Sequence, residues 1–200
     1  MIFLDLMNKL LLILGPSGVG KSSIIQEILR LDKQFMSMPT YTTRSLRIGE
    51  KEKTSISSRK LLEMQNRDEL LEINELYGNY YATPILPIIK AFAGNKIPIL
   101  DWPVSRLGVM RKAFPGQLYT VYLSPPSVEV LKQRLLNDGR SANGSRLQIA
   151  QEELKEYWSG RYVNLCNLNT VSHEGKQVEI AKMICKAYKL SVFENRDKSV

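Results

Sequence analysis

The sequence is poor in the residues that most often mark metal sites and covalent cross-links. Among 200 residues there is one histidine, His173, and there are only two cysteines, Cys166 and Cys185. A single histidine excludes a metal site built from several histidines. The two cysteines lack the spacing of a metal site, and we interpret them as the reduced thiols of a cytoplasmic protein.

Repeats, low-complexity tracts and long apolar runs are also missing. The apolar stretch from Met1 to Leu14 is interrupted by Asp5, lacks a signal-peptide cleavage site and is too short to span a bilayer. We therefore expect no membrane association. Met7 stands close to the predicted first strand, so both Met1 and Met7 qualify as the first residue of the protein.

Basic residues outnumber acidic ones by 28 to 20, but they do not gather into long runs. The absence of such runs argues against a nucleic-acid surface, so we expect no nucleic-acid partner. A net charge of +8 instead favours a cleft that holds several phosphates. The chain length, the 44% apolar share and the 8% aromatic share are typical of one α/β domain with room for insertions.

One stretch carries a clear chemical signature. Gly15-Pro16-Ser17-Gly18-Val19-Gly20-Lys21-Ser22 matches the phosphate-binding pattern of a glycine, four residues and then Gly-Lys-Ser/Thr. An apolar run of strand length (residues 9–14) precedes it, and apolar side chains at helical spacing (residues 24–31) follow it. In such a loop the backbone N–H groups converge on phosphate oxygens at a helix N-terminus. Lys21 is expected to reach the β- and γ-phosphates and Ser22 to ligate Mg²⁺, so the sequence predicts nucleoside triphosphate binding.

Strands and helices alternate along the rest of the chain. Further strands are predicted at residues 70–73, 96–101, 119–123 and 162–166, and helices at 61–64, 83–94, 104–114, 127–136, 147–158 and 178–188. Gly78-Asn79-Tyr80-Tyr81 is predicted to form a turn. The alternation indicates a parallel sheet covered by helices on both faces. Asp101 ends a buried strand, where a phosphate-loop enzyme needs an acid for its Mg²⁺ shell.

These motifs resemble those of the guanylate kinase family over residues 8–189. The phosphate loop is shared by many families, whereas an arginine pair followed by Gly-Asn-Tyr-Tyr is much more specific. The matching segments are Gly15–Ser23, Thr42-Thr43-Arg44-x-x-Arg47-x-Gly49-Glu50, Glu72 with Gly78-Asn79-Tyr80-Tyr81, Ser124-Pro125-Pro126-Ser127 with Arg134-Leu135, and Tyr162 with Asn167.

The resemblance implies an α/β P-loop nucleoside monophosphate kinase fold, with a parallel sheet flanked by helices, a small NMP-binding insertion and a short lid. The implied parts are a core of residues 1–37, 87–136 and 147–200, an NMP-binding domain of residues 38–86, and a lid of residues 137–146. The implied activity is ATP-dependent phosphorylation of GMP or dGMP to the diphosphate without a covalent intermediate. ATP and Mg²⁺ are the implied cofactors, nucleotides are the implied partners, and a monomer or a homodimer is compatible with the sequence.

Physical chemistry supports the residues that the resemblance points to. Arg44 and Arg47 offer fixed donor forks to a dianionic phosphate, and a tyrosine hydroxyl can donate to the same group. The Glu72 carboxylate can accept from guanine N1–H and N2–H together. The implied acceptor-binding residues are Thr40, Arg44, Arg47, Glu50, Glu72, Tyr81 and Thr83. The implied ATP-binding residues are Gly15, Ser17, Gly18, Val19, Gly20, Lys21, Ser22, Ser23 and Asn167. The implied catalytic residues are Lys21, Arg140 and Arg146, and the implied Mg²⁺ ligands are Ser22 and Asp101.

The chain also departs from the family pattern. The usual Asp-x-Asp is replaced by Asp101-Trp102-Pro103, so the metal-side acid is kept and the second acid is lost. The segment after Glu50 is shortened, and its usual phosphate-binding tyrosine is absent, with Thr54 nearby. The lid is shortened as well. These changes bear on efficiency and base selectivity more than on fold.

Two other functions are compatible with the motifs. Ribose 1,5-bisphosphate phosphokinase shares the fold, the short segment after Glu50 and the missing second aspartate. An inactive binding module that kept the fold is the other alternative. A bare sugar phosphate has no use for Glu72, and a binding module has no use for Lys21, Ser22 and Asp101. The sequence therefore favours the phosphorylation of GMP.

Overall fold

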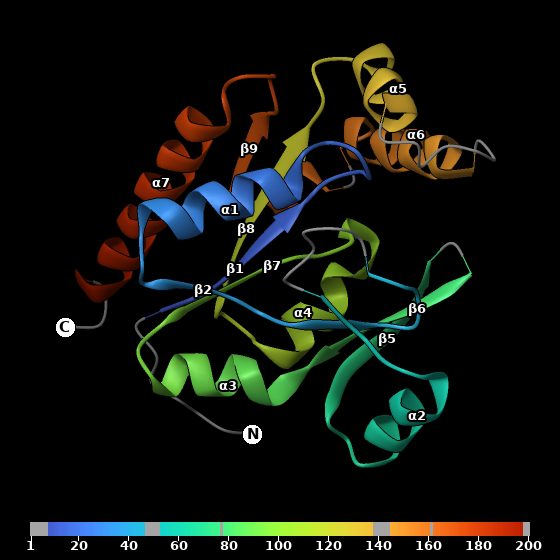
Figure 1. Cartoon of the computed structure of the whole chain (residues 1–200). Helices are drawn as coiled ribbons and strands as arrows, with labels where there is room; N and C mark the ends of the chain where they lie inside the picture. Colours follow the sequence, from blue (N-terminus) through green and yellow to red (C-terminus); the bar gives the residue numbers. More distant parts are fainter. Residues whose placement is uncertain (1–7, 47–52, 77, 138–144, 161, 198–200) are drawn as a thin grey trace.

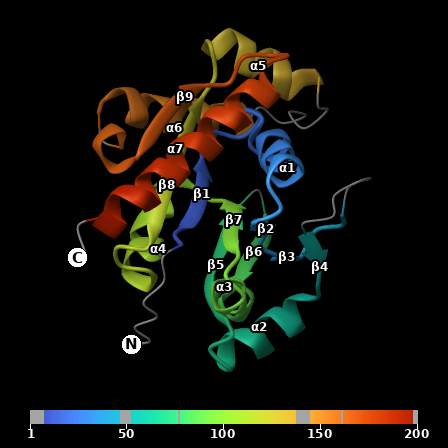
Figure 2. The ribbon, with the colours of Figure 1, turned by 90° about the vertical axis from the view of Figure 1, so that its left-hand side faces the viewer.

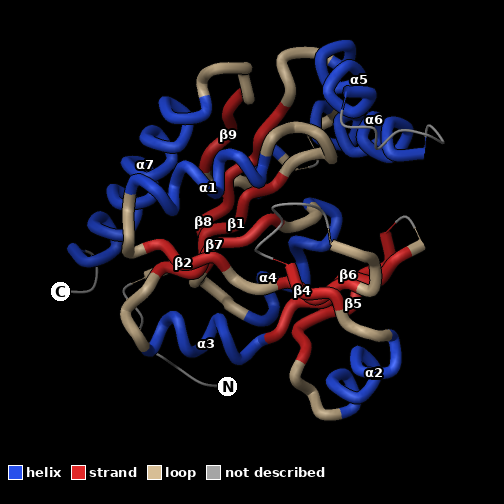
Figure 3. Tube along the Cα trace, viewed as in Figure 1, coloured by secondary structure: helices blue, strands red, loops and turns tan. Residues whose placement is uncertain are grey.

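The computed structural model describes residues 8–46, 53–76, 78–137, 145–160 and 162–197. Figures 1 and 3 show their arrangement into two sheets with surrounding helices. The strands are β1 (Leu10–Leu14), β2 (Phe35–Ser37), β3 (Thr40–Thr42), β4 (Lys53–Ser55), β5 (Leu70–Leu76), β6 (Asn79–Pro84), β7 (Ile97–Asp101), β8 (Leu118–Ser124) and β9 (Leu168–Val171). The helices are α1 (Lys21–Leu31), α2 (Ser58–Asn66), α3 (Ile85–Ala93), α4 (Leu107–Ala113), α5 (Val128–Asn137), α6 (Ser145–Trp158) and α7 (Gln177–Asp197), with 3₁₀ turns η1 (Val104–Arg106) and η2 (Val163–Leu165). Within this described part of the chain, no helix is both long enough and apolar enough to cross a bilayer.

The main sheet has five parallel strands in the order β2-β7-β1-β8-β9, which confirms the predicted parallel sheet. Every residue of β1 is buried because helices cover both faces. Leu11 and Ile13 point into the core that includes α1 and α7. Leu10, Leu12 and Leu14 point into the opposite core, which includes α3 and α4. Figures 1 and 2 show α1 and α7 lying side by side on one face of the sheet.

The second sheet has the order β4-β3-β6-β5, and its β3/β6 and β5/β6 pairs are antiparallel. All four strands lie within residues 38–86, the segment that the resemblance assigns to nucleoside monophosphate binding. The chain leaves β2 at Ser37 and enters β3 at Thr40. The second sheet therefore starts at the carboxyl edge of the main sheet, the edge at which β1 ends in the phosphate loop.

Two local predictions are wrong. Gly78 turns, with a φ of 69°, but Asn79 already starts β6, so the two tyrosines lie in a strand. Residues 162–166 contain the 3₁₀ turn η2, and the last strand begins only at Leu168. β9 is an edge strand whose side chains alternate between half-buried and exposed, so it lacks the apolar run that identifies a central strand. The apolar residues before it pack against the core without forming a strand.

Candidate active site

The loop of residues 15–20 connects β1 to α1 and packs its backbone tightly against β8. Gly15 has a φ of +132°, and a Cβ atom there would lie 2.3 Å from the backbone oxygen of Leu123. Gly20 is the N-cap of α1 and is left-handed, with a φ of +104°. Glycine alone meets both conditions without strain. The loop can therefore turn directly into α1, where unpaired backbone N–H groups favour an anion.

Lys21 opens α1 and folds back over the loop. Its Nζ donates to the backbone oxygens of Gly15, at 2.5 Å, and Pro16, at 3.0 Å. The ammonium group thus lies beside the part of the loop that is predicted to bind phosphates. The other predicted ATP contacts in this part of the chain lie in the loop and the first turn of α1; they are Ser17, Gly18, Val19, Gly20, Ser22 and Ser23.

Arg134 contacts the loop and Glu153 interacts electrostatically with Lys21, and the sequence motifs did not assign either residue to the site. Arg134 of α5 donates through Nη1 to the backbone oxygen of Val19 (3.2 Å) and through Nη2 to that of Ser172 (2.9 Å). Burial raises the pKa of the Glu153 carboxyl on α6, and the Lys21 ammonium opposes that shift. One signal for Glu153 was present in the sequence, because its spacing from the core residues of α6 puts it on the buried face of that helix.

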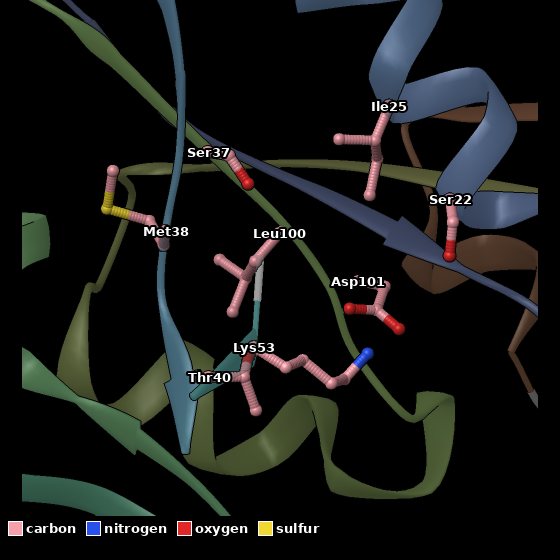
Figure 4. Close-up of a pocket in the computed structure, with 8 residues that line it drawn as sticks. All are labelled: Ser22, Ile25, Ser37, Met38, Thr40, Lys53, Leu100 and Asp101. Carbon is pink, nitrogen blue, oxygen red and sulfur yellow. The ribbon is translucent and has the colours of Figure 1, made fainter. Parts of the chain in front are cut away.

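Ser22 and Asp101, the predicted Mg²⁺ ligands, line one pocket at the carboxyl edge of the main sheet (Figure 4). Asp101 reaches this pocket because β7 pairs it with Ile13, just before the loop. Thr40 and Lys53 reach it from the second sheet, where they are partners in the register of β3 and β4. A carboxylate and a hydroxyl, completed by substrate phosphates and water, suit Mg²⁺. The residues present therefore fit the ion.

Lys53 lines the same pocket, although no sequence motif points to it. In the sequence Thr54 lies near the position of the missing tyrosine, but the Thr54 side chain is exposed. Lys53 is half-buried, and Figure 4 shows its side chain extending toward Asp101. Neighbouring residues of a strand point to opposite faces. The pairing of β4 with β3, which the sequence does not reveal, decides which of the two faces the pocket.

Arg44 and Tyr81, two members of the predicted phosphate-binding set, are in contact on the second sheet. Arg44 Nε donates to Tyr81 Oη over 3.2 Å, and the guanidinium carbon lies 6.0 Å from the ring centroid. They meet because Tyr81 pairs with Thr42 across β3 and β6, next to the segment that carries Arg44. Arg47 and Glu50 lie outside the described residues.

Glu72 lies in β5 opposite Thr83 of β6, and both side chains are largely buried. Glu72 Oε1 forms an ion pair with Arg106 Nη2. Glu72 Oε2 is buried and has no hydrogen-bond partner among the residues that the structure describes. An acceptor that is buried without a partner is costly in a folded protein, and a ligand that donates to it would remove that cost.

Asn167 does not lie with the rest of the predicted ATP site. Its Oδ1 accepts from the backbone N (2.8 Å) and the Oγ1 (2.9 Å) of Thr120. It stands just before β9, which runs parallel to β8, so it lies toward the end of the sheet opposite the loop. The predicted contact with ATP depended on the strand at residues 162–166, which the structure does not contain. The residue that follows β9 is Ser172, which lies at the loop. A Cβ atom added to Gly20 would be 3.3 Å from Ser172 Oγ.

Of the two predicted catalytic arginines of the lid region, one can be placed. Arg146 lies in the first turn of α6. Arg140 lies outside the described residues. The catalytic roles of both remain predictions.

Comparisons with known proteins agree with the motifs. A guanylate kinase family model matches residues 7–179 of the chain. The guanylate kinase of Carboxydothermus hydrogenoformans is 33% identical over 153 residues, which cover 74% of each chain. That of Lactobacillus johnsonii is 31% identical over 189 residues, which cover 88% of this chain and 92% of the relative.

Solved structures show the same fold at lower sequence identity. The guanylate kinase from Anaplasma phagocytophilum has a TM-score of 0.72 at 18% identity, and the match covers 93% of this chain and 87% of that one. A gluconokinase from Sinorhizobium meliloti 1021 has a TM-score of 0.56 at 17% identity, and the match covers 97% of this chain and 99% of that one. The fold is thus that of the P-loop nucleoside monophosphate kinases. Because the family model spans most of the sequence and the curated relatives are more than 30% identical over most of their length, the chain belongs to the guanylate kinase family of phosphotransferases.

Proposed function

We propose that the protein transfers the γ-phosphoryl group of ATP to GMP or dGMP, which yields ADP and the nucleoside diphosphate. The observation that carries this proposal is the buried Oε2 of Glu72, which lacks a hydrogen-bond partner among the described residues. Guanine presents N1–H and N2–H side by side, and one carboxylate can accept from both. The relatives from Carboxydothermus hydrogenoformans and Lactobacillus johnsonii are guanylate kinases, which supports the same acceptor.

On the donor side, the loop N–H groups and Lys21 would bind the phosphates of ATP. Lys21 would exchange its bonds to the Gly15 and Pro16 oxygens for bonds to β- and γ-phosphate oxygens. Ser22 and Asp101 would hold Mg²⁺, which when bound neutralises phosphate charge.

On the acceptor side, Arg44 and Tyr81 would grip the phosphate of GMP, with Arg47 as the second arginine. An oxygen of that phosphate would then attack the γ-phosphorus while the bond to the leaving oxygen of ADP breaks. No enzyme atom becomes phosphorylated, so catalysis consists of positioning and charge neutralisation. Arg140 and Arg146 are assigned to the transferring phosphoryl group on the resemblance alone.

The alternatives account less well for the same site. A ribose 1,5-bisphosphate acceptor has no base, so it would leave the buried Oε2 of Glu72 without a donor. An inactive binding module has no need for Ser22 and Asp101 in one pocket beside a phosphate loop.

A coupled assay of ADP formation with GMP, dGMP, AMP and ribose 1,5-bisphosphate separates these functions. We expect turnover with GMP and dGMP, and a kcat/KM for AMP lower by at least about 10²-fold, because adenine offers no matching donor pair to Glu72. Turnover with ribose 1,5-bisphosphate alone would contradict the proposal. A protein that binds GMP and ATP without forming ADP would be the binding module.

We also expect the molecule to close when both substrates bind. Residues 38–86 are predicted to move over the core together with the lid of residues 137–146, of which 138–144 lie outside the described residues, because phosphoryl transfer must exclude water to avoid hydrolysis. Small-angle scattering should show a smaller radius of gyration with a bisubstrate analogue than without it. The same radius in both samples at saturation would contradict this expectation.

A reducing compartment suits the two cysteines. Cys166 and Cys185 are both free, and burial raises the pKa of each thiol to about 11. Such thiols are poor nucleophiles at neutral pH and fit a structural role. Because both thiols are free, a location in the reducing cytoplasm is part of the proposal.

A further inference from the structure

Arg106 reaches Glu72 from a different part of the chain. Their ion pair joins Arg106 Nη2 to Glu72 Oε1, and the side chains are 45% and 9% exposed, respectively. The carboxylate therefore lies on the inner side of the pair and the guanidinium on the outer side. Glu72 Oε2 is buried and has no hydrogen-bond partner in the described parts of the chain. The pair thus divides the carboxylate into one oxygen that is held and one that remains for a ligand.

The backbone of Arg106 is held on both sides by the turn that follows β7. Its N–H donates to the backbone oxygen of Pro103 over 3.0 Å, and its own backbone oxygen accepts from Trp102 Nε1 over 2.9 Å. Trp102 is itself buried in the core with α3 and α4. The long side chain of Arg106 therefore starts from a fixed point, although its end is half-exposed.

Glu72, in contrast, lies on a strand that is poorly regular at this point. The pairing of β5 with β6 shifts register between Leu70 and Glu72, and β5 is an edge strand of the second sheet. Such irregularities change the direction of the side chains locally. A buried carboxylate also needs a partner for its charge. Arg106 both orients the Glu72 carboxylate and provides the opposite charge that it needs.

Resting on the proposed function, we propose that Arg106 is the positioning residue for acceptor-base recognition. It holds Glu72 Oε1 so that Oε2 faces the donors of the base. In this way it contributes to the preference for guanine over a base that lacks the 2-amino group. Arg106 itself does not touch the nucleotide in this role.

The test compares Arg106→Gln with the control variant Arg67→Gln. The control removes another arginine–glutamate ion pair, Arg67 Nε to Glu69 Oε1 at 3.0 Å, which lies just before β5 and outside the site. For Arg106→Gln we expect the KM for GMP to rise about 10-fold, the effect of losing one charge-assisted contact. The kcat at saturating GMP and the KM for ATP should stay within about twofold of wild type. The preference for GMP over IMP, which lacks the 2-amino group, should fall. Arg67→Gln should behave as wild type.

Two further variants separate positioning from a general loss of structure. Arg106→Lys keeps a cationic donor, so it should recover part of the GMP affinity and serves as the test if Arg106→Gln does not fold. In a Glu72→Gln background, Arg106→Gln should add less than about twofold to the KM for GMP, because the acceptor oxygen that Arg106 positions toward the base has already been lost. An unchanged KM and GMP/IMP ratio in Arg106→Gln, or full additivity with Glu72→Gln, would overturn the inference. A wild-type protein that does not phosphorylate GMP would instead overturn the proposed function.

Discussion

Lys21→Ala is expected to lower the kcat for GMP phosphorylation by about 10²–10³-fold, the effect of removing one preorganised donor from developing phosphoryl charge. The structure places the Lys21 ammonium over the loop, bound to the Gly15 and Pro16 oxygens. The variant would keep the loop glycines and their close contact with β8, and so would still offer N–H groups to phosphate. The loss should therefore appear in turnover more than in ATP binding. Steady-state kinetics and equilibrium binding of an ATP analogue measure the two effects.

The matched control is Lys33→Ala. Lys33 Nζ also donates to a backbone oxygen of α1, that of Leu29, at 3.1 Å, but it lies at the exposed end of the helix away from the loop. Its replacement should leave kcat within about twofold of wild type, as for an ordinary surface substitution. If Lys21→Ala and Lys33→Ala were both as active as wild type, the assignment of the phosphate site would be wrong. Circular dichroism and thermal unfolding of both variants exclude a general loss of fold.

Glu72→Gln should reduce kcat/KM for GMP by about 30- to 1000-fold, which corresponds to about 2–4 kcal/mol. The ion pair with Arg106 gives a further reason to expect so large a loss in kcat/KM. Because Arg106 donates to the Oε1 position, the glutamine oxygen would remain there and its amide N–H₂ would take the Oε2 position. That group would then face the guanine donors instead of accepting from them. The KM for ATP should hardly change, because the predicted ATP site lies on the main sheet.

Glu69→Gln is the control for this prediction. Glu69 is also paired with an arginine, Arg67, but its side chain is 42% exposed, against 9% for Glu72. We expect Glu69→Gln to keep its GMP efficiency within about twofold, since an exposed pair contributes little. A GMP-active wild type whose Glu72→Gln variant keeps its GMP efficiency would show that the base pocket has been placed wrongly.

The central strands and the phosphate loop could be predicted from the sequence because each carries a strong local signal. β1 and β7 are apolar runs, and the glycines of the loop stand where the backbone is left-handed or too close to β8 for a side chain. The edge strand β9 has no such signal, since its side chains alternate between half-buried and exposed. The last strand was therefore predicted at residues 162–166 instead of 168–171. Asn167, which was expected to follow that strand at the ATP site, precedes β9 instead.

The contacts across the site could not be predicted, because they join segments that are distant in sequence. Arg106 belongs to a short turn after β7 and Glu72 to a strand of the other sheet, and nothing local in either segment points to the other. Lys53 likewise faces the pocket only through the pairing of β4 with β3. Residue type and spacing identify which side chains can do the chemistry. Register and layer packing decide which of them meet.

Evolution of the acceptor preference is constrained by the turn between Asp101 and Arg106. The first residue of this turn lines the pocket of Ser22, and the last one holds Glu72. A substitution that moves the turn would therefore affect the binding of the donor nucleotide and of the acceptor nucleotide at the same time. A new base preference is expected to arise by substitution of Glu72 on β5 more readily than by substitutions in the turn. The residues between Asp101 and Arg106 should consequently change more slowly than their exposure alone suggests.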